Sequence, residues 1–166
     1  MPEGYAHTTI DESFFLTVAG LAMSFAGFTG LMNALRRQGE TWAPMELYQL
    51  RIIVAYAIAT LFASILTIPF VELFGLREGV QWLGLLVLVV ATALGLGNMV
   101  SDIRGAHGTR LPRRVRVTFT LITILGLVAL LASSLTGALT LYRLALILLL
   151  AMPAGTFAYV VARLNR

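Results

Sequence analysis

A chain of 166 residues that is 58% hydrophobic and only 12% charged cannot be an ordinary soluble domain, in which about 25% of residues are charged. The chain has no cysteine, which excludes disulfides, thiolate metal sites and thiol catalysis. All twelve lysine-or-arginine positions are arginine, which also excludes Schiff-base chemistry and a P-loop lysine. We therefore expect an all-α fold, with residues 1–166 forming one integral membrane domain.

The first apolar segment, residues 13–35, carries no charge and is followed directly by two arginines. At about 1.5 Å per residue, a helix of this length reaches roughly 34 Å, which is enough to cross the hydrocarbon core. Small side chains recur on one side of this helix, and we call them the small-residue face: Gly20, Ser24, Gly27 and Ala34. In lipid, such a face lets another helix backbone approach closely, so it predicts a helix-packing surface.

The second predicted span covers residues 52–74. In the loop before it Pro44 favours a helix start, and inside it Pro69 predicts a kink or a loosened last turn. Hydroxyl side chains repeat along one face at spacings of four, four and three residues, and we call them the hydroxyl stripe: Tyr56, Thr60, Ser64 and Thr67. They could line a polar path for a transported species, or they could hydrogen-bond to neighbouring helices and to carbonyls one turn back.

A short segment, residues 75–79, has room only for a turn and leads to a third predicted span over residues 80–101. The loop that follows is basic and is broken by two glycines and a proline. Four arginines in and beside this loop are candidates for contact with anionic lipid or an acidic partner: Arg110, Arg113, Arg114 and Arg116. The same arginines could instead serve only to set the orientation of the chain in the membrane.

The stretch from Val117 to Ala162 contains forty-six residues and a single charge, Arg143. As one helix it would measure about 69 Å, more than twice the thickness of the bilayer core, so it must fold back. We place the break at residues 135–142. The fourth span then covers residues 115–137 and the fifth covers residues 141–163.

The arginines are distributed unevenly between the predicted loops. With the N-terminus outside, ten of the twelve arginines lie on the cytoplasmic side and two, Arg77 and Arg143, lie outside. This alternation is what the positive-inside rule predicts for five spans. We therefore expect an outside N-terminus and a cytoplasmic C-terminus, in the cell (inner) membrane of a bacterium-like cell.

Few side chains in the predicted spans have the chemistry of a catalytic or cofactor site. Asn33 and Asn98 could pair with each other or orient a ligand, and Glu72 could pair with Arg77 or Arg143 at the outer surface. The two histidines lie outside the spans, which excludes bis-histidine haem ligation within the membrane. We expect no metal, no cofactor, no nucleic-acid partner and no enzymatic activity.

Two functions are compatible with these features. The first is a small channel-like or permease-like protein, in which a homo-oligomer brings several hydroxyl stripes around one axis. The alternative is an accessory or scaffold subunit of a larger membrane complex, in which the small-residue face of the first span docks the partner.

Overall fold

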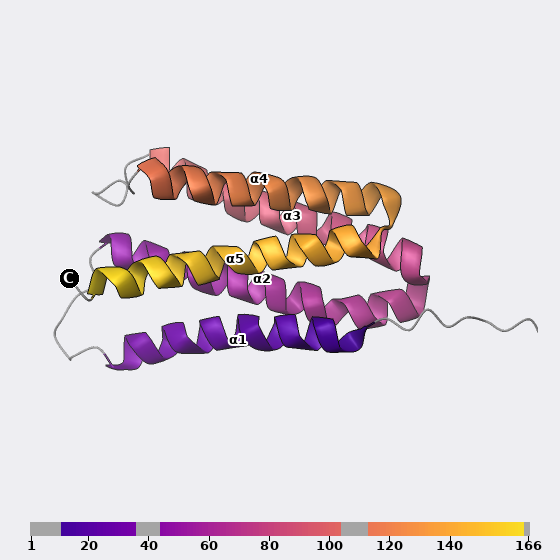
Figure 1. Cartoon of the computed structure of the whole chain (residues 1–166), viewed down its shortest axis with the longest axis horizontal. Coiled ribbons are helices and arrows are strands. Elements are labelled where there is room, and N and C mark those ends of the chain that lie inside the picture. Colours follow the sequence, from indigo (N-terminus) through magenta and orange to yellow (C-terminus); the bar gives the residue numbers. More distant parts are fainter. Residues whose placement is uncertain (1–10, 36–43, 104–112, 165–166) are drawn as a thin grey trace, which may run out of the picture.

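The computed structural model of the chain describes residues 11–35, 44–103 and 113–164. These residues form five α-helices, each long and apolar enough to cross a membrane. They are α1 (Glu12–Leu35), α2 (Pro44–Phe74), α3 (Leu76–Ile103), α4 (Arg113–Thr136) and α5 (Leu139–Leu164) (Figure 1). The prediction of an all-helical chain with five potential spans is confirmed. The side of the membrane on which each terminus lies stays a prediction.

Helices α2 to α5 form an up-and-down bundle in which each helix packs against the next and α5 returns to α2. Helix α1 lies outside this ring and packs against α2 and α5. Within the described residues it makes no contact with α3 or α4, and Figure 1 shows α1 and α4 at opposite edges of the molecule. One long side of α1 is therefore left without a neighbouring helix.

Glycines end two of the helices. Gly75 follows α2 with φ of 79° and Gly137 follows α4 with φ of 70°, a left-handed conformation that glycine adopts without a steric penalty. The amide of Gly75 donates to Val71 O at 2.9 Å, and that of Gly137 donates to Ser133 O at 2.8 Å. Both predicted breaks are therefore confirmed, although each connection is shorter than expected from the sequence.

Helix α2 is longer than the predicted span. It begins at Pro44 rather than at residue 52, because proline fits the first turn of a helix, where its missing amide hydrogen is not needed. With 31 residues it measures about 46 Å, more than the roughly 30 Å of a bilayer core. The helix continues through Pro69, and α5 continues through Pro153, so neither proline ends its helix.

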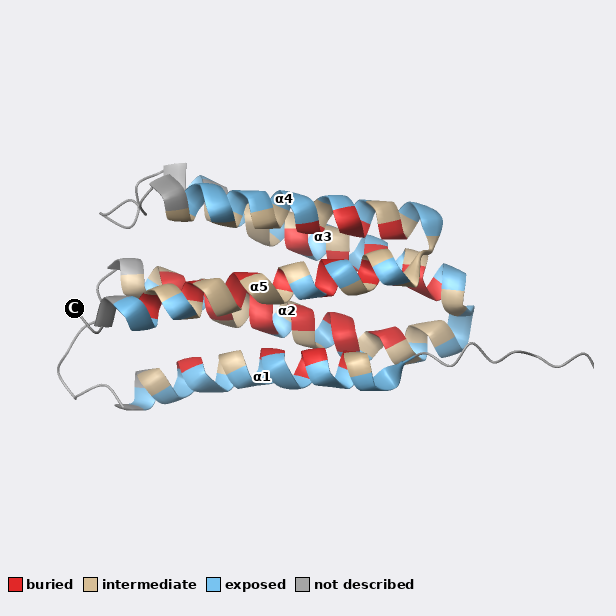
Figure 2. Ribbon diagram, in the orientation of Figure 1, coloured by how far each residue is buried: buried red, intermediate tan, exposed pale blue. Residues whose placement is uncertain are grey.

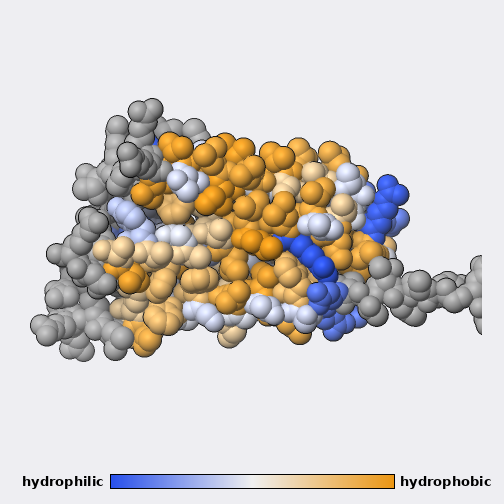
Figure 3. Space-filling view, in the orientation of Figure 1, coloured by the Kyte–Doolittle hydropathy of each residue, from blue (hydrophilic) through white to orange (hydrophobic). Residues whose placement is uncertain are grey.

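The interior of the bundle is built from large side chains of several helices, and the outside is also apolar. Among the most buried are Tyr56, Leu83, Leu130, Tyr142 and Leu146, each at most 1% exposed (Figure 2). Large apolar side chains also cover the outer surface, as the space-filling view shows (Figure 3). An apolar surface this extensive is unfavourable in water and is compatible with a multi-spanning membrane protein.

Candidate functional site

The hydroxyl stripe of α2 faces the interior of the bundle. Tyr56 is 1% exposed, and Thr60, Ser64 and Thr67 are completely buried. Two copies of the chain cannot share this face around a common axis unless the bundle opens. A pore formed between copies by this stripe, as the sequence suggested, therefore does not fit the structure of the single chain.

Two of the four hydroxyls of the stripe bond to the carbonyl oxygen one turn earlier in α2. Thr60 Oγ1 donates to Tyr56 O and Thr67 Oγ1 donates to Ala63 O, each at 2.8 Å. This is the second of the two roles that the sequence left open, and it is common for hydroxyl residues in apolar helices. Ser64 differs, because its buried Oγ has no hydrogen-bond partner within the described residues.

Asn98 of α3 contacts two tyrosines of α2. Its backbone oxygen accepts a hydrogen bond from Tyr48 Oη at 3.2 Å, and its side chain is hydrogen-bonded to Tyr56. The sequence suggested that Asn98 pairs with Asn33 or orients a ligand. The structure gives it tyrosine partners instead, and the side chain of Asn33 lies outside the described part. Asn98 therefore joins α2 to α3 near the end at which α2 begins.

At the opposite end of the bundle, Arg143 of α5 contacts the start of α1. Its Nη2 lies 3.9 Å from Asp11 Oδ2, and its guanidinium carbon lies 5.2 Å from the ring centre of Phe14. The sequence suggested Glu72 as an acid that pairs with an arginine at this end. In the described part of the chain, Arg143 pairs with Asp11 instead, whereas Glu72 is exposed. Figure 3 shows a hydrophilic streak where α1 and α5 begin.

Asp11 also caps helix α1. Ser13 Oγ donates to Asp11 Oδ1 at 2.5 Å, and the amide of Phe14 donates to the Asp11 backbone oxygen at 3.2 Å. The Ser13 hydrogen bond is the main reason that the pKa of Asp11 is lowered from 3.8, with smaller contributions from Phe14 and Arg143. The carboxylate is therefore stabilised in its charged form at the start of α1.

The small-residue face of α1 points away from the bundle. Gly20, Ser24, Gly27 and Ala34 are all exposed. A Cβ atom added at Gly20 or at Gly27 would meet nothing within 4 Å. The side of α1 that packs on α2 and α5 is the opposite one, at about 180° by helical spacing, and consists of Phe15, Val18, Ala22 and Thr29. Among the residues that the structure describes, therefore, the small-residue face packs against no other helix.

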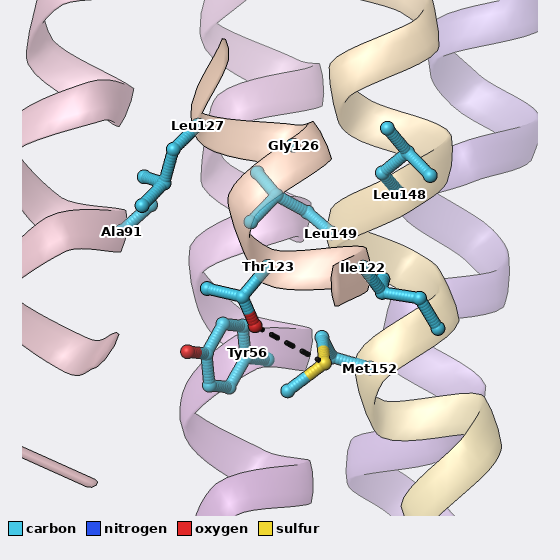
Figure 4. Close-up of a pocket in the computed structure, with 9 residues that line it drawn as sticks. All are labelled: Tyr56, Ala91, Ile122, Thr123, Gly126, Leu127, Leu148, Leu149 and Met152. Atoms are coloured by element: carbon cyan, nitrogen blue, oxygen red, sulfur yellow. Dashed lines mark hydrogen bonds between the residues drawn. The ribbon is translucent and has the colours of Figure 1, made fainter. Parts of the chain in front are cut away.

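An interior cavity lies where α2, α3, α4 and α5 meet (Figure 4). Its volume is about 10 Å³, and all but two of its lining residues, Tyr56 and Thr123, have apolar side chains. Thr123 Oγ1 lies 3.6 Å from Met152 Sδ across this space, as the dashed line shows. A cavity of this size holds at most about one water molecule, so it is too small to be a substrate site.

The basic loop is only partly described. Arg110 lies outside the described residues, Arg113 and Arg114 begin α4 with side chains that are not described, and Arg116 is exposed. Their contact with anionic lipid or with an acidic partner stays a prediction.

In the part of the chain that the structure describes, no three His, Asp or Glu side chains gather in a group that could hold a metal ion. Comparison with known proteins finds no matching family model, no similar curated protein and no similar solved structure.

Proposed function

We propose that the chain is an accessory or scaffold subunit of a larger membrane complex, docked to its partner through the small-residue face of α1. One observation carries this proposal: α1 buries one side on α2 and α5 and presents its smallest side chains on the opposite side. If this side of α1 faced only lipid, glycine at positions 20 and 27 would bring no advantage, because lipid chains pack equally well on larger side chains.

Helix association in hydrocarbon depends on close contact, because apolar burial alone gives no driving force there. The small-residue face is suited to such contact. By helical spacing, Met23 borders it on one side, and Leu21 and Phe28 border it on the other. Leu16 and Leu31, which are also exposed, fall within the arc of the face. The Ser24 hydroxyl already donates to Gly20 O at 2.8 Å, so a partner helix need not supply it with an acceptor.

The test is to fill the face. In the chain carrying both Gly20→Leu and Gly27→Leu, we expect the partner to be lost while membrane insertion is retained. The readout is the native mass of the complex after gentle extraction from its own membrane. Gly97→Leu on α3 is the matched control, because a Cβ there also meets nothing within 4 Å. Retention of the partner by the doubly substituted chain, or a wild-type mass equal to one chain, would reject the docking role.

The channel-like or permease-like function is the second candidate. Polar groups buried inside one chain favour it, since Ser64 Oγ and Gln49 Nε2 have no hydrogen-bond partner within the described residues. A polar path would then run through a single bundle rather than between copies. Combined Thr60→Val and Ser64→Ala substitutions should abolish flux of ions or small solutes into liposomes. Unchanged flux, or no flux through the wild-type chain, rejects this function.

The orientation belongs to the same proposal. We expect α1 to begin outside and α5 to end in the cytoplasm of a bacterium-like cell, and we expect no enzymatic activity. The absence of cysteine makes the orientation easy to test, because one introduced cysteine is then the only thiol. A cysteine replacing exposed Glu78, at the start of α3, should react with a membrane-impermeant reagent added to intact cells. One replacing exposed Arg116, at the start of α4, should not.

A further inference from the structure

Helices α2 and α3 are held together at two separate places. Near the turn that joins them, a Cβ atom added at Gly79 would lie 2.7 Å from the Phe70 carbonyl oxygen, so the two backbones are in close contact. Toward the other end, Tyr48 Oη donates to Asn98 O at 3.2 Å. Between these two contacts the helices leave a groove of about 260 Å³, which we call the α2–α3 groove.

The α2–α3 groove is deep and opens to the outside of the bundle. Its lining includes Tyr56, Ala91 and Leu149, which are buried and come from three different helices, so it extends into the bundle interior. Its rim is exposed, with Phe62 of α2 58% exposed and Leu86 of α3 47% exposed. If the five helices span a bilayer, this opening faces the hydrocarbon of the membrane.

The chemistry of the lining selects an apolar occupant. Tyr56 is the single lining residue with a polar group in its side chain, and that side chain is hydrogen-bonded to Asn98. The other lining residues are aliphatic, apart from Phe62, and three are alanines whose small side chains leave the space: Ala59, Ala63 and Ala91. A ligand in the groove is therefore recognised by shape and apolar contact alone.

A positive charge lies in line with the groove. Exposed Arg51 precedes Ile58, a lining residue, by seven residues, so the two share one face of α2 and lie about 10 Å apart along it. Phe62 lies about 16 Å from Arg51 along the same helix, close to the thickness of one leaflet of the core, roughly 15 Å. An acyl chain that starts at the level of Arg51 therefore reaches the groove.

We propose that the α2–α3 groove binds one acyl chain of an anionic phospholipid from the leaflet nearest the start of α2, with the lipid phosphate at Arg51. Arginine suits this role because its guanidinium forms charge-assisted hydrogen bonds with phosphate oxygens. The inference rests on the membrane placement of the five helices and not on the docking role of α1.

The test uses the full chain in vesicles of phosphatidylcholine that contain phosphatidylglycerol with a photoreactive diazirine in one acyl chain. We expect cross-links to concentrate on the groove walls, within residues 58–66 and 83–94, rather than on the exposed side of α4. Ala59→Phe, which fills the groove, should lower groove labelling at least fivefold. Ala93→Phe is the matched control, because Ala93 is exposed on α3 and does not line the groove. If Ala59→Phe does not fold, Val90→Phe on the exposed rim replaces it.

The headgroup is tested separately. With the wild-type chain, the phosphatidylglycerol probe should label the groove more strongly than a phosphatidylcholine probe with the same acyl chain. Arg51→Gln should remove that preference, whereas Arg116→Gln at the same end of the bundle should retain it. Equal labelling of the groove and of α4, or labelling unaffected by a phenylalanine in the groove, would overturn the lipid site. Equal labelling by both probes would overturn the role of Arg51.

Two further outcomes separate this inference from the proposed function. Cross-links between copies from a photoreactive side chain at position 59 would assign the groove to a second copy of the chain and overturn the lipid assignment. In the chain carrying both Gly20→Leu and Gly27→Leu, we expect groove labelling to be unchanged, since α1 lies on the other side of α2. Loss of lipid labelling in that chain would instead show that the groove depends on the docked partner.

Discussion

The phenol of Tyr142 on α5 donates a hydrogen bond to the carbonyl oxygen of Ala63 on α2, at 2.9 Å, in the interior of the bundle. Tyr142 is completely buried, and its ring also packs against Phe15 of α1, with ring centres 6.4 Å apart. One side chain therefore connects the three helices α1, α2 and α5. These are the helices that hold α1 against the four-helix ring.

Replacing Tyr142 by phenylalanine keeps the ring contact and removes the donor. We expect Tyr142→Phe to lower the free energy of unfolding by about 0.5–1.5 kcal/mol, the range for one hydrogen bond in proteins. The loss is limited because the Ala63 carbonyl still accepts a bond from Thr67 Oγ1. Unfolding in mixed micelles with increasing dodecyl sulfate measures it. Tyr159→Phe on the same helix is the control, and an equal loss in both variants would contradict the specific role of Tyr142.

Gly79 and Gly97, both on α3, should respond oppositely to the same substitution. Gly79→Ala places a Cβ atom 2.7 Å from a backbone oxygen, so we expect a loss of about 1–3 kcal/mol in the free energy of unfolding. Gly97→Ala meets nothing within 4 Å and should raise it by up to about 1 kcal/mol, because alanine favours the helix. The same unfolding titration measures both. A neutral Gly79→Ala variant would show that α2 and α3 do not touch there.

Ser64 is the member of the hydroxyl stripe whose replacement by alanine should not lower the free energy of unfolding. Its buried Oγ has no partner within the described residues, and an unpaired buried hydroxyl costs roughly 1–3 kcal/mol. We expect Ser64→Ala to leave the free energy of unfolding unchanged or to raise it by about 1 kcal/mol. Ser133→Ala is the control, because its equally buried hydroxyl donates to Leu130 O at 2.8 Å. A clear loss for Ser64→Ala would reveal a bound water or solute at this hydroxyl.

The contribution of the Asp11 carboxylate to stability should depend on pH in a defined direction. Because the pKa of Asp11 is lowered from 3.8 in the folded chain, chiefly by the Ser13 hydrogen bond, its contribution to stability is fully present above 3.8. That contribution is lost as the pH falls through the lowered pKa. The difference in Tm between wild type and Asp11→Asn should therefore be constant from about pH 7 to pH 5 and shrink below about pH 4. A difference that vanishes near pH 6 would contradict this assignment.

The number and approximate positions of the helices could be predicted from the sequence because they depend on local properties. Apolar length predicts a span, and a glycine with positive φ ends a helix wherever the chain must turn, as at Gly75 and Gly137. The length of α2 was less predictable. Pro44 indicated a helix start, but the predicted span began only at residue 52, whereas the helix continues without a break from Pro44 into the apolar part.

The faces of the helices could not be predicted in the same way. Helical spacing shows that Gly20 and Gly27 share a side, and that Thr60 and Ser64 share another, but it does not show which side turns inward. That choice depends on contacts with other helices. In the structure, α2 turns the hydroxyl stripe inward and α1 turns the small-residue face outward. A pore shared between copies would require the hydroxyl stripe to face outward.

By itself, then, the sequence determined that this chain has five apolar helices, because hydrophobic length and turn residues act within a few neighbouring positions. Only the tertiary structure decided which side chains gather. The α2–α3 groove exists because contacts at Gly79 and at Asn98, nineteen positions apart in α3, hold two helices together at both ends and leave them apart between. Long-range contacts of this kind leave no pattern in a single sequence.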